Sequence, residues 1–176
     1  MEKVMNVIQT LEARKPLPPL CPTEIWDPQI SKEILMMSDN EVTGLNNPSI
    51  WAASATRSGL LLWNDDLDAS HAISQKMKEQ IGSYWHGIMH RREGDFSNAK
   101  YWFSLVGSHD IFESLFRQSC EIMPELTEWG RWQPDRFIDL VENAVSNNSG
   151  AASEGEKLCQ IQAIEIALLI QYSRNA

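Results

Sequence analysis

The sequence predicts an all-α protein, a helical-hairpin bundle of about seven to eight helices. Apolar residues recur at helical spacing along most of the 176 residues. Helix-start signals, in which an Asn, Asp or Ser cap precedes a proline or an acidic residue three positions on, stand before most of these segments. No segment alternates between apolar and polar residues strongly enough to predict a strand.

The chain begins with a short amphipathic segment followed by a proline-rich one. Val4, Ile8 and Leu11 fall on one side of a helix predicted over residues 2–14. Residues 16–22 contain four prolines and cannot continue that helix, because proline lacks the backbone donor and restricts its predecessor. We therefore expect residues 1–22 to form a helix and an extended strap, and residues 23–176 to form a single all-α domain.

The remaining helices follow from caps and punctuation. Asn47-Pro48 starts one helix, while Asp95 and Gly107 bound another. The polar segments 38–47 and 145–151 are expected to be loops. After the strap, helices are predicted over residues 28–37, 48–63, 66–73, 79–93 and 95–106. Three more are predicted from their start signals. One starts at a capping box formed by Asp110 and Glu113, one starts at Pro134, and the last runs from a capping box formed by Ser153 and Glu156 to about residue 172.

An internal repeat supports the hairpin arrangement. Residues 64–70 align with residues 93–99 at an offset of 29, and each segment joins two predicted helices. The turn resembles that of a tetratricopeptide-type hairpin, although any pair of helices with an Asp cap can share it. The acidic residues Asp65, Asp66 and Asp68 are expected to form a solvated hairpin tip, since the glycine and terminal glutamate of a calcium loop are absent.

Composition limits the classes of function. Hydrophobic residues make up 43% of the chain and charged residues 22%, and the formal charge is −9. An acidic chain repels nucleic-acid phosphates and anionic lipid, so we expect neither as a partner. Three widely spaced cysteines form no disulfide framework or zinc knuckle, and no signal peptide or membrane span is evident, so a cytoplasmic location is expected. Common nucleotide-binding and hydrolase motifs are absent.

Residues 83–109 carry the chemistry-bearing side chains. His86, His90 and Glu93 are spaced i, i+4 and i+7, so they share one side of the predicted helix. Two imidazoles and a carboxylate can bind a divalent metal ion. Alternatively, His86 or His90 is a catalytic acid or base beside arginines that hold an anionic substrate. In a third, purely structural alternative, the histidines cap helices, stack on Trp85 or Trp102, or are solvated.

A buried ion pair is also predicted. Glu165 falls near the centre of the apolar side of the last helix, where an unpaired carboxylate is costly. Arg92 lies in the middle of another apolar face, and we expect these two side chains to pair at the floor of a cleft. The predicted ligand-binding residues are His71, His86, His90, Arg91, Arg92, Lys100 and Glu165.

Three classes of function remain open from the residues. The first is a domain that binds a small polar or anionic molecule, or a partner segment, in this pocket. The second is an enzyme, with His86, His90 and Glu93 as metal ligands or acid–base groups. The third is an adaptor that binds proteins through an apolar hairpin groove.

The central motif resembles a family of uncharacterised proteins. Residues 84–95 read YWHGIMHRREGD, followed by Asn98, the run KYWF over 100–103, Gly107 and His109. Members of that family carry the pattern YWHxIMHRRExDxxNxKYWF, and weaker similarity extends over about residues 50–173. The resemblance implies a helical fold and no specific activity. This chain departs from the pattern at Ser104-Leu105, where basic residues are expected, and at Asp110, where proline is expected.

Overall fold

The computed structural model describes residues 2–147 and 152–175, and within them every regular element is a helix. The all-α prediction is confirmed. The described helices outnumber the seven to eight expected. They are α1 (Glu2–Glu12), α2 (Pro28–Met36), α3 (Asp39–Thr43), α4 (Ile50–Trp63), α5 (Leu67–Ser74), α6 (Gln80–Glu93), α7 (Phe96–Val106), α8 (Phe112–Ile122), the 3₁₀ helix η1 (Pro124–Trp129), α9 (Pro134–Ser146) and α10 (Ala152–Ser173). The short helix α3 occupies a segment predicted as a loop, and the short helix η1 one for which no element was predicted.

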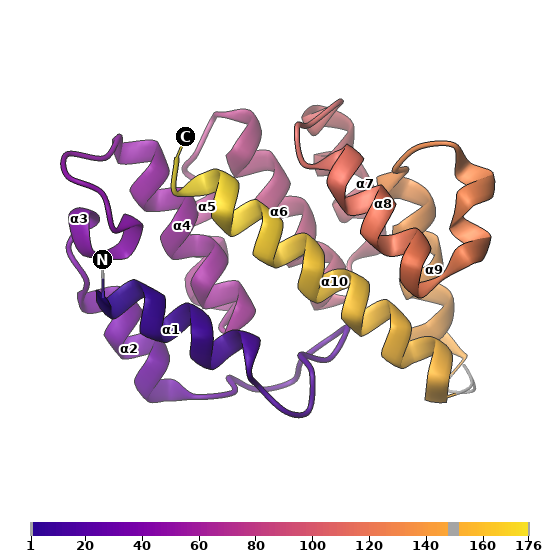
Figure 1. Cartoon of the computed structure of the whole chain (residues 1–176), viewed down its shortest axis with the longest axis horizontal. Helices are drawn as coiled ribbons and strands as arrows, with labels where there is room; N and C mark the ends of the chain where they lie inside the picture. The colour runs from indigo at the N-terminus through magenta and orange to yellow at the C-terminus, as the bar shows by residue number, and fades with distance from the viewer. Residues whose placement is uncertain (1, 148–151, 176) are drawn as a thin grey trace.

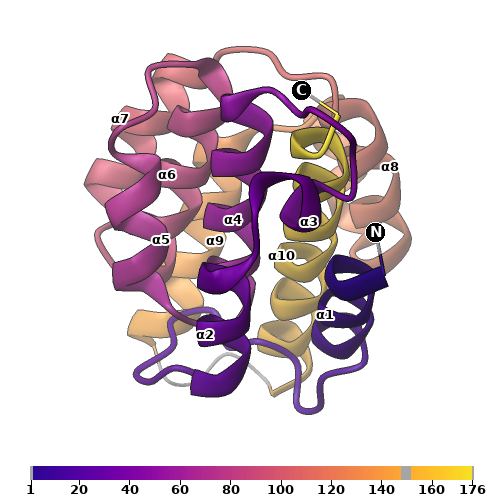
Figure 2. The ribbon, with the colours of Figure 1, turned by 90° about the vertical axis from the view of Figure 1, so that its left-hand side faces the viewer.

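The long C-terminal helix α10 crosses one face of the molecule in front of α4 and α6 (Figure 1). Helices α1 to α3 lie at one end and α7 to α9 at the other. Turned by 90°, the ribbon shows α5 and α6 on one side, α10 and α1 on the other, and α4 between them (Figure 2). Helix α6 is enclosed, since every residue from 81 to 92 is buried. The pattern of apolar residues along this helix therefore does not show which neighbouring helix each of its polar side chains faces.

The turns of the two hairpins α4–α5 and α6–α7 have the same backbone conformation. Asp65 and Gly94 both have positive φ, at 64° and 88°. The aspartates that follow them, Asp66 and Asp95, have φ/ψ of −86°/74° and −90°/74°, and each accepts a hydrogen bond from the backbone N–H three residues on. The repeat seen in the sequence thus encodes one turn used twice.

The strap, which in the structure is the whole segment between α1 and α2 (residues 13–27), joins α1 to the rest of the molecule. Val4, Val7 and Leu11 of α1 are buried in the same core as residues of α4, α6 and α10. At the far end of the strap, the Trp26 backbone N–H donates to the Asn64 carbonyl at 3.0 Å. The proposed boundary at residue 22 stays a prediction, although α1 packs into the core of the larger part.

Three predicted local features are wrong. The helix expected to start at Asn47-Pro48 begins at Ile50, because the Ser49 side chain caps it by accepting from the Ala52 backbone N–H. The segment 38–47 contains α3, because Ser38 and Glu41 form a reciprocal capping box. The capping box expected at Asp110 and Glu113 does not form, since α8 begins at Phe112 without a side-chain cap. The loop predicted over 145–151 falls partly outside the described residues, and α9 continues to Ser146.

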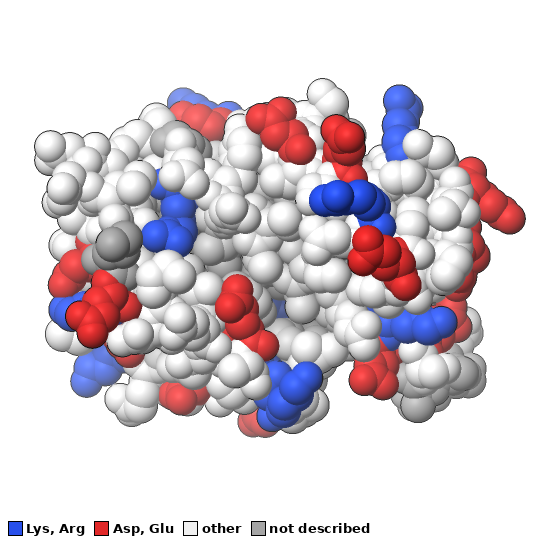
Figure 3. All heavy atoms as spheres, viewed as in Figure 1, with Lys and Arg blue, Asp and Glu red and all other residues white. Residues whose placement is uncertain are grey.

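Charges of both signs are interspersed on the face shown in Figure 3, with no continuous basic patch on it. Among the described helices, none combines the length and the hydrophobicity that crossing a membrane requires.

Candidate functional site

Three consecutive residues near the end of α6 point to three different parts of the molecule. Successive side chains of a helix are separated by about 100°. His90 faces α5 and α7, Arg91 faces α10, and Arg92 faces the end of α4 and the strap, as their contacts show. These divergent directions divide the predicted pocket into separate clusters.

Arg91, not Arg92, pairs with Glu165. The Arg91 Nη2 atom lies 2.6 Å from Glu165 Oε2, and both side chains are fully buried. Tyr84 donates its hydroxyl proton to Glu165 Oε1 at 3.0 Å, and Gln162 accepts from Arg91 at 3.3 Å. The expectation of a buried partner for Glu165 is correct, but the partner was wrong because α6 is buried on all sides. Desolvation raises the pKa of the Tyr84 hydroxyl well above its usual value, so it stays a donor.

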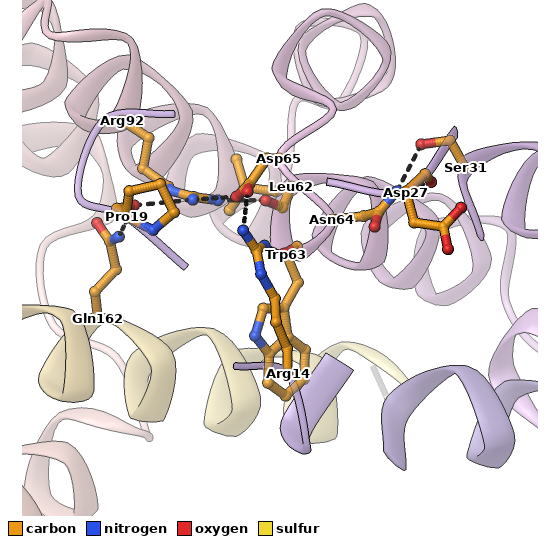
Figure 4. A network of polar contacts seen from close by, with 10 residues as sticks. All are labelled: Arg14, Pro19, Asp27, Ser31, Leu62, Trp63, Asn64, Asp65, Arg92 and Gln162. Carbon is orange, nitrogen blue, oxygen red and sulfur yellow. Dashed lines mark hydrogen bonds and ion pairs between the residues drawn. The ribbon is translucent and has the colours of Figure 1, made fainter. Parts of the chain in front are cut away.

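Arg92 pairs instead with Asp65 in the turn after α4 (Figure 4). Each Asp65 oxygen accepts from one guanidinium, Oδ1 from Arg92 and Oδ2 from Arg14, both at 2.5 Å. Arg92 also donates to the backbone carbonyls of Leu62 and Pro19. The sequence predicts that Asp65 lies in a solvated hairpin tip, and this prediction is wrong. Asp65 is buried and links α6 to the end of α1 through its two arginine partners.

The histidines form the second cluster. His71 on α5, His86 and His90 on α6 each offer a ring nitrogen, and these atoms lie within 4.8 Å of one another. His86 and His90 are buried, while His71 is partly exposed. The sequence correctly predicts that His86 and His90 lie together. The third group beside them is the His71 imidazole, whereas the predicted set has the Glu93 carboxylate in that place.

Close packing of α7 against α6 shapes this cluster. The Trp102 ring stacks on His86 with ring centroids 4.0 Å apart and an interplanar angle of 16°. Gly87 lies one residue further on, where a Cβ atom would come within 2.9 Å of the Phe103 ring. The stack covers a face of the His86 ring but leaves its buried Nδ1 without a hydrogen-bond partner among the described residues.

The environment keeps the His86 and His90 imidazoles neutral. Burial, with smaller contributions from His90 and His71, lowers the pKa of His86 to about 4. Burial also lowers the pKa of His90, against an opposing effect of Glu93. A neutral imidazole has a free nitrogen lone pair, which is the form that binds metal ions.

Glu93 and Asn98 define the orientation of the His90 ring. The His90 Nδ1 atom lies 3.1 Å from Glu93 Oε2, and the Asn98 side-chain amide lies 3.1 Å from Nε2. A proton on Nδ1 that is donated to Glu93 leaves Nε2 as the lone-pair nitrogen. Metal-bound histidines usually donate their other nitrogen to a carboxylate in this way. The Glu93 carboxylate is thus placed to hold the His90 ring, and it is not one of the three groups that converge.

The other predicted residues lie elsewhere. Lys100 pairs with Asp139 of α9 at 2.5 Å, and both side chains are substantially exposed. His109 is buried against Tyr84 and Tyr172. Sequence reasoning missed Arg14 and Asp65, because an arginine at a helix end and an acidic turn are typical of solvated positions. It gave Asn98 no role in the site, although Asn98 is part of the central motif.

Comparisons of the chain with protein-family models, with curated proteins and with solved structures found no match. The resemblance of residues 84–109 to an uncharacterised family therefore stays a prediction.

Proposed function

We propose that the protein binds a divalent transition-metal ion through His71, His86 and His90, and that a small polar or anionic molecule binds at the position the protein leaves open. The observation that carries the proposal is the convergence of three imidazoles from two helices. Three protein ligands and one exchangeable position are typical of zinc sites that act on small molecules.

The distances suit such a site. Zinc–nitrogen bonds of about 2.0–2.1 Å place the nitrogens of a tetrahedral centre roughly 3.3 Å apart. The observed nitrogens lie within 4.8 Å of one another, so small side-chain rotations bring them to that spacing. Partly exposed His71 gives an ion access from solvent. An ion on His90 Nε2 would replace the hydrogen bond from Asn98.

In this proposal, fewer of the predicted residues contact the ligand. Arg91, Arg92 and Glu165 are paired within the core, and Lys100 is paired on the surface. These four residues stabilise the fold and do not contact the ligand. In the absence of a metal ion, His86 and His90 remain the candidates for acid–base roles.

We also propose that the hairpins α4–α5 and α6–α7 are two copies of a tetratricopeptide-like unit. The matching turn conformations at Asp65-Asp66 and Gly94-Asp95 support this proposal. A reducing location such as the cytoplasm is part of the same proposal, and the three free cysteines are consistent with it.

Metal titration tests the main proposal. Chelator-treated protein should bind one Co²⁺ ion per chain and develop the visible absorption of a tetrahedral nitrogen-ligated centre. The single variants His71→Gln, His86→Gln and His90→Gln should each lose this absorption. His109→Gln is the matched control, because His109 is the fourth histidine and lies outside the cluster.

Two results would contradict the proposal. One is unchanged Co²⁺ binding in folded His86→Gln protein, and the other is a sulfur-to-cobalt absorption band, which would place the ion on cysteine. Azide tests the open position separately: it should change the spectrum of the Co²⁺ protein, and an unchanged spectrum would leave a metal site without an exchangeable position.

A further inference from the structure

A second site lies under the strap, apart from the histidines. A cavity of about 610 Å³, open to solvent on one side, is lined by the end of α1, the strap and the first turns of α10. Arg14 and Asp65 line it, together with Trp26 from the strap. Cavities of this size hold small organic molecules.

The ion-paired cluster beside this cavity has more cations than anions. Arg14, Arg91 and Arg92 are buried, and their carboxylate partners are Asp65 and Glu165. Three guanidinium groups therefore share two carboxylates, so the ion-paired set carries one positive charge in excess, although a third buried carboxylate, Asp66, lies beside it. The neighbouring Asp66 carboxylate caps α5 and makes no ion pair among the described residues. An excess buried charge is costly unless a counter-charge reaches it.

Arg14 is the member of the cluster that a molecule in the cavity can reach. Its side chain extends from the end of α1 to Asp65 (Figure 4) and also donates to the Trp63 carbonyl. The Nε–H of Arg14 is buried and has no acceptor among the described residues. A guanidinium with a free donor and a surplus charge is suited to a carboxylate.

Much of the remaining lining is apolar, although Lys15, Thr23, Glu24 and Glu156 also line the cavity. Leu17, Ile25 and several prolines form the walls, and the Trp26 ring stacks on the Arg14 guanidinium at 4.7 Å. We propose that this cavity binds a small organic monocarboxylate, with its carboxylate at Arg14 and an apolar body against the strap. One negative charge balances the surplus of the cluster.

The acidic residues of the cavity favour a monoanion over a more highly charged one. Glu24 and Glu156 also line it, and both are exposed to solvent. Screening by water and salt weakens their repulsion of a single negative charge, whereas a dianion such as phosphate is repelled more strongly. A cation would be attracted to these two carboxylates but repelled by the arginines.

Binding of a matched set of probes tests the proposal. Phenylacetate should bind saturably with millimolar affinity by ligand-detected NMR and should raise the thermal midpoint. Neutral phenylacetamide should bind about tenfold more weakly, since it lacks the charge that strengthens a hydrogen bond to arginine. Phenethylamine and inorganic phosphate should not bind. Equal affinity for phenylacetamide, tighter binding of phenethylamine or phosphate, or no saturable binding of phenylacetate would overturn the proposal.

Substitutions of Ile25 at the cavity mouth avoid the buried network, whereas Arg14→Lys alters it but keeps the positive charge. Ile25 is partly exposed and lines the cavity, so Ile25→Glu should fold and weaken phenylacetate binding several-fold, while Ile25→Gln should change it little. Arg14→Lys should also lose affinity, with Arg57→Lys on α4 as the control outside the cavity. Equal binding by the two Ile25 variants would overturn the proposed site. Because no histidine of the metal site lines this cavity, either proposal can fail without the other.

Discussion

The two polar clusters around α6 differ in which polar atoms are left without a partner among the described residues: guanidinium N–H groups of Arg14, Arg91 and Arg92 in the ion-pair cluster, and an imidazole nitrogen of His86 in the histidine cluster. In the ion-pair cluster, Asp65 and Glu165 each accept a guanidinium hydrogen bond within the core, and neighbouring carbonyls accept others. In the histidine cluster, three imidazoles face one another without an acidic residue between them, and a buried nitrogen of His86 has no partner among the described residues. Paired groups hold helices in place, whereas unpaired lone pairs can accept a ligand. The charge pairs account for the contribution of the first cluster to stability, and the unpaired imidazole nitrogen supports the metal site that we propose for the second.

Breaking the ion-pair cluster should have the largest effect on stability. Glu165→Ala removes the partner of a fully buried guanidinium, so the free energy of unfolding should fall by about 3–5 kcal/mol. Urea denaturation measures this change. A loss below about 1 kcal/mol would show that the cluster is not structural. Protein that remains folded should bind Co²⁺ as the parent does, since Glu165 does not contact the imidazoles.

Substitution of Glu93, which contacts His90 of the histidine cluster, should have the opposite effect: weaker metal binding with little change in stability. Glu93→Gln should lower the affinity for Zn²⁺ about 10–100-fold, because the carboxylate orients the His90 ring and increases its basicity. The free energy of unfolding of the metal-free protein should change little, since the Glu93 side chain is 56% exposed. Competition with a chelating dye measures the affinity, and Glu113→Gln on α8 is the control. Unchanged affinity would remove Glu93 from the site.

Acid should destabilise the metal-free protein through the histidine cluster. The pKa of His86 is about 4 in the folded chain against an ordinary value of 6.5, so the unfolded chain binds the proton more readily. The contribution of this group to stability is complete above pH 6.5 and is lost as the pH falls toward 4. The free energy of unfolding should therefore depend less on pH between 6.5 and 4 in His86→Gln. Identical slopes for the two proteins would contradict the assigned burial effect.

The surface pair should have the smallest effect. Lys100→Ala removes a partly exposed ion pair with Asp139, which contributes less than about 1 kcal/mol. Thermal unfolding should change only slightly, and Zn²⁺ affinity should be equal to that of the parent. A clear loss of Zn²⁺ affinity would return Lys100 to the binding site that the sequence predicts.

Local signals in the sequence determined the helices and the repeated turn. Caps such as Asp66 and Asp95 act within a few residues, so the boundaries of α5 and α7 could be predicted from neighbouring residues alone. The i, i+4 spacing likewise brought His86 and His90 to one side of α6. The sequence also indicated that Glu165 needs a partner, since a carboxylate on an apolar helix face is costly.

Only the tertiary structure decided which groups meet. Helix α6 is surrounded by other helices, so periodicity could not show that Arg91 faces α10 while Arg92 faces Asp65. His71 reaches the other histidines because the α4–α5 hairpin packs beside α6, and a distance of fifteen or more residues along the chain gives no sign of that contact. Burial and proximity depend on the packing of whole helices, and for that reason the partners of these polar groups are a property of the fold.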